Sequence, residues 1–325
     1  MILKKIALTG LTSAALALTG MQAHAQASGY PAKTITLIVP FSAGGGADNA
    51  ARIFAQGMEA VSGQPVVVEN KAGASGSIGA AQVARAAPDG YTVLFDASSF
   101  TLNPVLRKLP YDPKKDFVPV SQAIVVPNIL VVAPGSPFQT LGDLIKAAKA
   151  APNDLTYASY GPGSLAQMAA ELLKKEAGIE MVHVPYKGGA PAMVDVMAGH
   201  VGAYFANAAS SLNYVTTDRL RALAVTSTKR MPELPNVPTV AEAGIKDFSV
   251  YEWNGLFVPG GTPDAVVQKL YEIVKAALAR PDITEKLARL GLTPVGSSPA
   301  EFAAFLAAED ARWREVVKAN NISLD

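Results

Sequence analysis

Apolar and polar positions alternate along the chain between short strand-like runs and longer runs of helical period. "KTITLIVPF" (33–41) has the apolar, β-branched composition of a buried strand, and "PVVVEN" (65–70) and "YTVLFDA" (91–97) follow the same pattern. Between these runs, residues 48–61 and 75–87 repeat apolar positions at helical spacing. Strands that alternate with helices predict an α/β fold, with mostly parallel or mixed sheets flanked by helices.

The second half of the chain continues this alternation. "LTYASYGPGS" (155–164) predicts a strand that runs into a glycine-rich turn, and "LAQMAAELLKKEAG" (165–178) predicts the helix after it. "IVVPNILVVAP" (124–134) predicts either a pair of strands or one long strand that crosses between domains. The capping-box pattern of a helix start, a serine or threonine followed three residues later by an acidic or amide side chain, occurs at Thr140, Ser164, Thr239 and Ser298.

The N-terminal segment has the pattern of a secretory signal peptide. Lys4 and Lys5 precede an apolar, small-residue run over 6–18, and "AHA" (23–25) has the small-x-small pattern of a cleavage site. A transmembrane anchor is the alternative, but the apolar run is shorter than the roughly 20 residues that span a bilayer. We therefore expect residues 1–25 to be removed and the mature protein to be exported.

About 300 residues remain after the signal peptide, which is more than one core usually organises, so two domains are expected. The proline-rich stretch 230–239 resembles a rigid connection between domains, because each proline fixes one backbone dihedral. We expect a discontinuous first domain over 26–125 and 233–325, with a second domain over 126–232 inserted into it.

The composition excludes several classes of function. The chain has no cysteine, which removes disulfides, thiol catalysis and a lipid-modified cysteine anchor together. With three histidines and no cysteine, a zinc site is not expected, and no motif indicates a cofactor. The formal net charge is +1 with both signs mixed along the chain, which argues against nucleic-acid binding. A soluble, exported globular protein is the expectation.

Two glycine-rich loops join a strand to a helix, one in each half: "PFSAGGGADN" (40–49) and "SYGPGS" (159–164). Backbone amides and the positive end of a helix make such a loop a cradle for anions. Serine and glycine crowd both loops, while lysine and arginine are absent from them. Two helix starts in separate domains would therefore close on a small organic acid from both sides.

Two other functions have candidate residues. "GPGSLA" (161–166) matches the G-x-G-x-x-A pattern of dinucleotide binding, but no acidic residue ends the next strand at the expected distance. His183 could pair with Asp195 in an exported α/β hydrolase acting on a small carboxylate or ester, but no G-x-S-x-G elbow accompanies them. The strand pattern of "MVHVPY" favours a structural histidine at a strand end.

Several long segments resemble one known family: "YPAKTITLIVPFSAGGGADNAAR", "VVVENKAGASGSIGAAQVARAAPDGYTVL", "HVPYKGGAPAMVDVMAGHV" and "RALAVTSTKRMPELPNVPTVAEAG". They closely resemble the Bug family, the extracytoplasmic solute receptors of tripartite tricarboxylate transporters, and the resemblance covers essentially the whole mature chain. It implies a hinged, two-domain periplasmic binding protein, similar to type II receptors. It also implies a monomer without catalytic activity that binds organic acids and delivers them to membrane transporter subunits.

In that family, two loops hold a ligand carboxylate largely through backbone groups and bridging water. In the first loop, the resemblance assigns this role to Phe41, Ser42, Ala43, Gly44, Gly45 and Asp48. In the second loop, it assigns the role to Ser159, Tyr160, Gly161, Pro162, Gly163 and Ser164. Ser98 and Ser99 follow the third strand and either face the same cleft or lie in a solvated loop.

One segment departs from the family's pattern. Relatives commonly carry an aspartate after the phenylalanine of "YFANAASSL", whereas this chain has Ala206 and then Asn207. This change argues against an amino-acid ligand, whose ammonium group needs a carboxylate partner. We include Asn207 among the binding residues and expect an aromatic or aliphatic mono- or dicarboxylate as the ligand.

Overall fold

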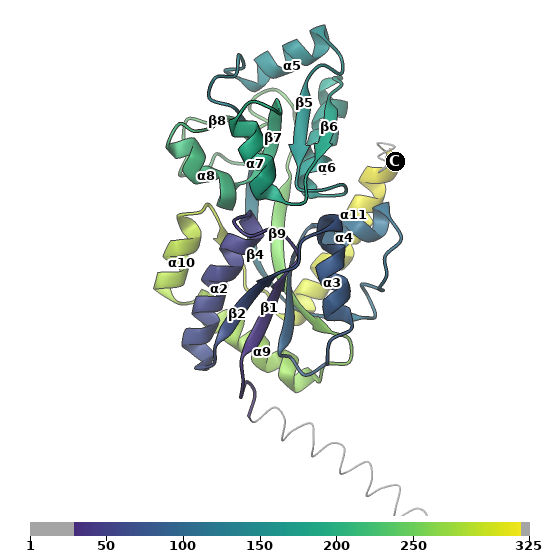
Figure 1. Ribbon diagram of the computed structural model, residues 1–325, viewed down its shortest axis with the longest axis vertical. Coiled ribbons are helices and arrows are strands. Elements are labelled where there is room, and N and C mark those ends of the chain that lie inside the picture. The colour runs from purple at the N-terminus through teal and green to yellow at the C-terminus, as the bar shows by residue number, and fades with distance from the viewer. Residues whose placement is uncertain (1–28, 320–325) are drawn as a thin grey trace, which may run out of the picture.

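The computed structural model describes residues 29–319 of the chain. The predicted signal peptide, residues 1–25, lies outside this range. Within residues 29–319 the chain forms two α/β domains, which lie one above the other and are joined by long strands (Figure 1). None of the helices in this range has the length and apolar character needed to cross a membrane.

The lower domain is built on a sheet whose first three strands are parallel. Strand β1 (Ile35–Val39) pairs with β2 (Val66–Asn70) and with β3 (Thr92–Ala97). The apolar strand runs predicted from the sequence are therefore confirmed, and Leu37 and Val93 are fully buried. The connecting elements are α2 (Gly46–Ser62), the 3-10 turn η1 (Ala74–Gly76), α3 (Ser77–Ala84) and α4 (Ser99–Leu106).

Two long antiparallel strands connect the domains. Strand β4 (Phe117–Val132) is one continuous strand, which settles the choice left open for residues 124–134. Up to Pro127 it pairs with β9 (Tyr251–Pro259), and from Asn128 onward it pairs with strands of the upper domain. Because β9 also pairs with β3, the segment after residue 250 completes the lower sheet.

The upper domain has a second, smaller set of strands. Strand β5 lies between β7 and β6 and is parallel to both. Strands β7 and β8 each pair antiparallel with β4. Four helices surround these strands (Figure 1). In chain order the elements are α5 (Leu141–Ala150), β5 (Thr156–Ser159), α6 (Leu165–Ala177), β6 (Val182–Pro185), α7 (Gly189–Met197), β7 (Ala203–Asn207), α8 (Ala208–Thr216) and β8 (Arg221–Val225).

The remaining C-terminal elements return to the lower part of the molecule. Helices α9 (Asp264–Leu278) and α10 (Pro281–Ala288) contact α2, and α11 (Pro299–Ala319) contacts α4. The short strand β10 (Thr293–Pro294) pairs with β4.

The capping boxes have different outcomes. Thr140 and Asp143 form a complete box at the start of α5. Thr239 and Glu242 exchange the same pair of bonds, but they close only a short turn rather than a helix. Gly244 follows with a φ of 111°, a left-handed conformation that ends the turn after its first hydrogen bonds. The predicted helix at Thr239 is therefore wrong.

Candidate functional site

A cavity lies between the two domains, where the loop after β1 meets the starts of two upper helices. The residues that line it come from β1–α2, β3, the β5–α6 loop, α7, β7–α8 and β9. They are Phe41, Gly45, Gly46, Ala47, Ala97, Tyr160, Gly189, Tyr204, Asn207, Ser210, Glu252 and Asn254. Phe41, Gly45, Tyr160 and Asn207 are the sequence-predicted residues among them.

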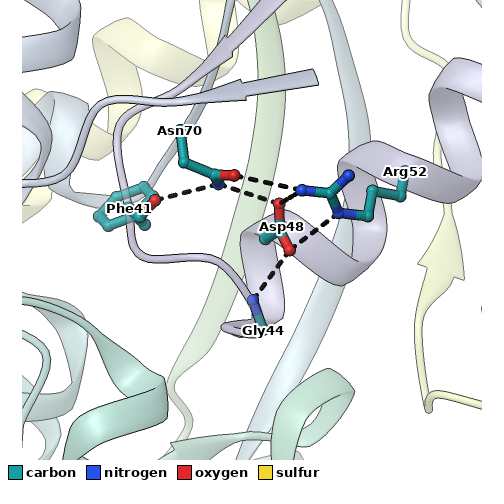
Figure 2. Close-up of polar contacts among 5 residues, drawn as sticks. All are labelled: Phe41, Gly44, Asp48, Arg52 and Asn70. Carbon is teal, nitrogen blue, oxygen red and sulfur yellow. Dashed lines mark hydrogen bonds and ion pairs between the residues drawn. The ribbon is translucent and has the colours of Figure 1, made fainter. Parts of the chain in front are cut away.

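The first loop is fixed by a buried carboxylate (Figure 2). Asp48 Oδ2 accepts hydrogen bonds from the Gly44 amide at 2.9 Å and from Arg52 Nε at 3.0 Å. Asp48 Oδ1 accepts one from Asn70 Nδ2 at 2.9 Å, and the same amide group donates to the Phe41 carbonyl at 3.1 Å. Asp48 thus shapes the loop, because its oxygens are occupied by protein donors and it does not line the cavity.

Burial of Asp48 raises its pKa, but the hydrogen bonds from Arg52, Gly44 and Asn70 outweigh burial and hold the pKa below its ordinary value. The carboxylate is therefore ionised at neutral pH. A charged acceptor binds amide donors more strongly than a neutral one, so this ion orders the loop that leads into α2.

The cavity receives the N-termini of three helices. Gly45 caps α2 without any side-chain hydrogen bond, so the first-turn amides of α2 have no partner from a cap. Gly188 is the N-cap residue of α7, and it likewise provides no side-chain hydrogen bond. Asn207 caps α8, and its Oδ1 accepts from the Ala209 amide at 2.9 Å. Three positive helix ends from both domains thus surround one small space.

The start of α7 was not among the sequence-predicted site residues. A signal for it exists, because "VPYKGGAP" (184–191) repeats the strand, glycine and helix order of the two loops that were chosen. Gly189 lies against the Tyr204 hydroxyl, and a Cβ on Gly189 would come within 3.2 Å of that oxygen. The glycine therefore permits close approach of the helix start to the cavity.

The second loop contacts the lower domain directly and contributes only Tyr160 to the cavity. The Pro162 carbonyl accepts a hydrogen bond from Ser75 Oγ at 2.6 Å and a short one from the Arg107 guanidinium. The Gly163 amide donates to Gln167 Oε1 at 2.7 Å, and Ser164 Oγ accepts from the Gln167 amide at 3.4 Å. These loop groups are therefore satisfied within the protein.

The other predicted residues lie around the cavity rather than in its wall. Ser98 Oγ accepts from the Trp253 amide at 3.1 Å, and Ser99 is buried beside the Asp96 carboxyl group. Ala43 is exposed at the tip of the first loop. Ser42 lies against Gly188, where any Cβ would overlap its hydroxyl, so the first loop and the start of α7 are in close contact.

Sequence reasoning missed the cavity's only acidic wall residue among those described, Glu252. Its side chain is 3% exposed, Oε1 accepts from the Tyr160 hydroxyl at 2.6 Å, and Oε2 accepts from Asn207 Nδ2 at 3.2 Å. Burial raises the pKa of Glu252 to about 7, although both hydrogen bonds lower it. The available signal was an acidic residue inside the apolar strand run "YEWNGLFVP" (251–259).

The residues proposed for a hydrolase do not assemble. His183 Nε2 lies 2.7 Å from Ser159 Oγ, whereas Asp195 accepts from the Tyr186 hydroxyl at 2.5 Å and pairs with His200 at 3.5 Å. Ser159 is fully buried and also contacts the Gly161 backbone. His183 and Ser159 therefore stabilise the second loop. Residues 29–319 contain no group of three or more acidic or histidine side chains suited to a metal ion.

Two α/β domains that close on a cavity through helix N-termini define the class of periplasmic binding proteins. Residues 50–322 match the family described as the tripartite tricarboxylate transporter family receptor. The chain belongs to this family.

Individual relatives agree with this assignment over nearly the full length. The UPF0065 protein of the tcbD-tcbE intergenic region of Pseudomonas sp. (strain P51) is 40% identical over 310 residues, 94% of this chain and 92% of that protein. The periplasmic binding protein BugD superposes with a TM-score of 0.87 at 35% identity, covering 90% of this chain and 99% of BugD. R. palustris Rpa4515 with adipate superposes at 0.88 with 37% identity, covering 90% of this chain and 99% of Rpa4515. The resemblance to the Bug family is thereby confirmed.

Proposed function

We propose that this protein binds a small organic acid between its two domains in the periplasm and delivers it to the membrane subunits of a tripartite tricarboxylate transporter. The observation that carries the proposal is the convergence of three helix N-termini on one cavity between the domains. Amide donors and helix dipoles in such a place stabilise carboxylate oxygens. The family membership and the adipate in Rpa4515 support the same ligand class.

The proposed domain boundaries are those expected from the sequence, with 26–125 and 233–325 in one domain and 126–232 in the other. The crossing strands β4 and β9 act as the hinge. Closure is held by contacts such as Ser75 to Pro162 at 2.6 Å and Asn49 Nδ2 to the Ala209 carbonyl at 3.0 Å. These bonds can break without disturbing the β4–β9 ladder, so the domains open around it.

In this proposal, the fifteen predicted binding residues have two roles. Phe41, Gly45, Tyr160 and Asn207 contact the ligand, because they line the cavity. The rest support the cavity from outside its wall: Asp48 is the main support of the first loop, and Ser98 bonds to the Trp253 amide of β9. No step of chemistry is involved, and the protein works as a monomer without a cofactor.

The direct test is calorimetry of residues 26–325 with a panel of carboxylic acids, together with a variant that fills the cavity. A Cβ at Gly46 would lie 2.4 Å from Asn207 Oδ1, so Gly46→Val should weaken binding by roughly a hundredfold or more. Gly135→Val is the control, because no atom lies within 4 Å of a Cβ there.

Three outcomes would overturn the proposal: no acid binds, a bound acid is consumed on standing, or Gly46→Val binds as tightly as the parent. Consumption of the acid would favour the hydrolase alternative. In small-angle scattering, the protein should become more compact when a binding acid is added, and an unchanged profile would remove the hinge from the proposal.

A further inference from the structure

The carboxyl group of Glu252 sits in the wall of a cavity otherwise suited to an anion. It comes from the start of β9, next to the junction of the two domains, and faces the same cavity as the starts of α2, α7 and α8. A carboxylate there repels a ligand carboxylate unless it is offset by a positive group. Its surroundings therefore decide which ligands the cavity accepts.

Both neighbours of Glu252 are locked as hydrogen-bond donors. Asn207 Oδ1 already accepts from the Ala209 amide at 2.9 Å, so its NH₂ group must face Glu252. The Tyr160 hydroxyl accepts from the Leu165 amide at 3.1 Å, so its hydrogen points to Glu252. Two fixed donors on a buried carboxyl group favour the ionised form.

No cation balances this charge within the described chain. The titratable side chains that interact with Glu252 among residues 29–319 are Tyr160, Tyr204 and Asp96. Burial and the nearby Glu252 charge raise the pKa of both tyrosines, so they stay neutral. Asp96 carries the same sign as Glu252, and burial raises its pKa to about 7. A buried carboxylate with neutral donors and no cation carries a large desolvation penalty.

We infer, on the basis of the proposed function, that Glu252 is a specificity-determining residue that accepts a hydrogen bond from an ammonium group on the ligand. The ligand carboxylate meets the helix N-termini, and the ammonium beside it meets Glu252, so the ligand is an amino acid rather than a plain acid. Asn207 holds the Glu252 carboxylate in place through its side-chain amide.

The two ligand classes require opposite charge states of Glu252. An ammonium favours the ionised carboxylate and lowers its pKa, so amino acids should bind more tightly as pH rises from 5.5 to 8. A plain acid binds only after Glu252 takes up a proton, so its affinity should fall over the same range. Ligand ammonium groups remain charged at both values, which assigns the pH dependence to the protein.

The test uses calorimetry on three matched pairs: L-alanine with propionate, L-aspartate with succinate, and L-phenylalanine with 3-phenylpropionate. At pH 8 the amino member of at least one pair should bind more tightly in the parent protein. Glu252→Gln should reduce this preference roughly tenfold or more, the usual range for a hydrogen bond to a charged group. The preference ratio is the readout, because it cancels any general weakening.

Glu309→Gln is the matched control. Glu309 is also buried, at 8% exposed, but it accepts from Trp313 Nε1 at 2.9 Å in α11, away from the cavity. Its substitution should leave the preference unchanged. If Glu252→Gln fails to fold, the pH dependence of the parent protein with each pair decides the matter.

The inference is overturned if plain acids bind more tightly than their amino partners at pH 8, or if Glu252→Gln changes both members of a pair equally. In those cases the proposed function survives, since an acid still binds. If no member of any pair and no other carboxylic acid binds, the proposed function fails together with the inference.

Discussion

The two glycine-rich loops look alike in sequence, but only the first leaves backbone amides of a helix start without a side-chain cap. The first loop ends at Gly45, which gives α2 no side-chain cap and leaves the first-turn amides facing the cavity. The second ends at Ser164, whose hydroxyl caps α6 while Gln167 takes up the Gly163 amide. An uncapped glycine leaves donors for a ligand, whereas a serine cap satisfies them internally. The cap residue, more than the glycine count, separates a binding loop from a contact loop.

Removing the support of the first loop should have the largest effect. Asp48→Ala leaves Gly44, Arg52 and Asn70 without their acceptor, and we expect a loss of about 3 kcal/mol in unfolding free energy. Binding of the best acid found by calorimetry should fall by roughly a hundredfold. Urea denaturation measures the first quantity and calorimetry the second.

The counterpart in the second loop is Gln167→Ala. This substitution should lower the unfolding free energy by about 1–2 kcal/mol. It should change ligand affinity less than roughly fivefold, because the groups it frees do not line the cavity. Equal losses of affinity in Asp48→Ala and Gln167→Ala would remove the distinction between the loops.

The second loop reaches the cavity only through Tyr160 and its bond to Glu252, so the charge of Glu252 is the next point to test. The pKa of Glu252 in the folded protein, about 7, lies above its ordinary value of 4.5. The folded protein therefore binds the proton more tightly, and stability falls as pH rises from about 4.5 to 7. Without ligand, the unfolding free energy of the parent protein should fall by about 3 kcal/mol relative to that of Glu252→Gln across this pH range.

This pH dependence is measured by urea denaturation of both proteins at intervals between pH 4 and 8. The size of the difference at any one pH also reflects the new amide facing Asn207, so the charge is read from how the difference changes with pH. A difference that stays constant from pH 4 to 8 would mean that Glu252 titrates normally in the folded protein.

The smallest effect concerns the contact that the second loop makes with the lower domain. Ser75→Ala removes the hydrogen bond to the Pro162 carbonyl, and it should weaken ligand affinity about threefold to tenfold by favouring the open form. Ser77→Ala is the control, since its hydroxyl bonds to Ala74 within the same segment. If both variants bind alike, this bond does not contribute to closure.

The fold was largely predictable because local patterns determine it. Alternating strand and helix runs, together with the Thr140 capping box, identified elements that the structure confirms. The site was less predictable, since the environment of Glu252 is set by Tyr160 and Asn207, which lie 92 and 45 residues away in the chain. Whether a lone acidic residue in a strand is exposed or buried depends on such distant partners. The direction of the Gly161–Gly163 backbone likewise depends on Ser75 and Arg107 across the interface.

The place of β9 in the sheet also governs the order in which the molecule can be built. Asp96 in β3 faces Gly255 in β9, so the lower sheet joins segments from opposite parts of the chain. A chain that emerges N-terminus first, from a ribosome or a membrane pore, cannot complete this sheet until residues near 259 have appeared. Pairings of such long sequence separation form slowly, because their loop-closure entropy must be overcome before any contact is gained. The lower domain therefore becomes complete only after the upper domain between its two parts has been made.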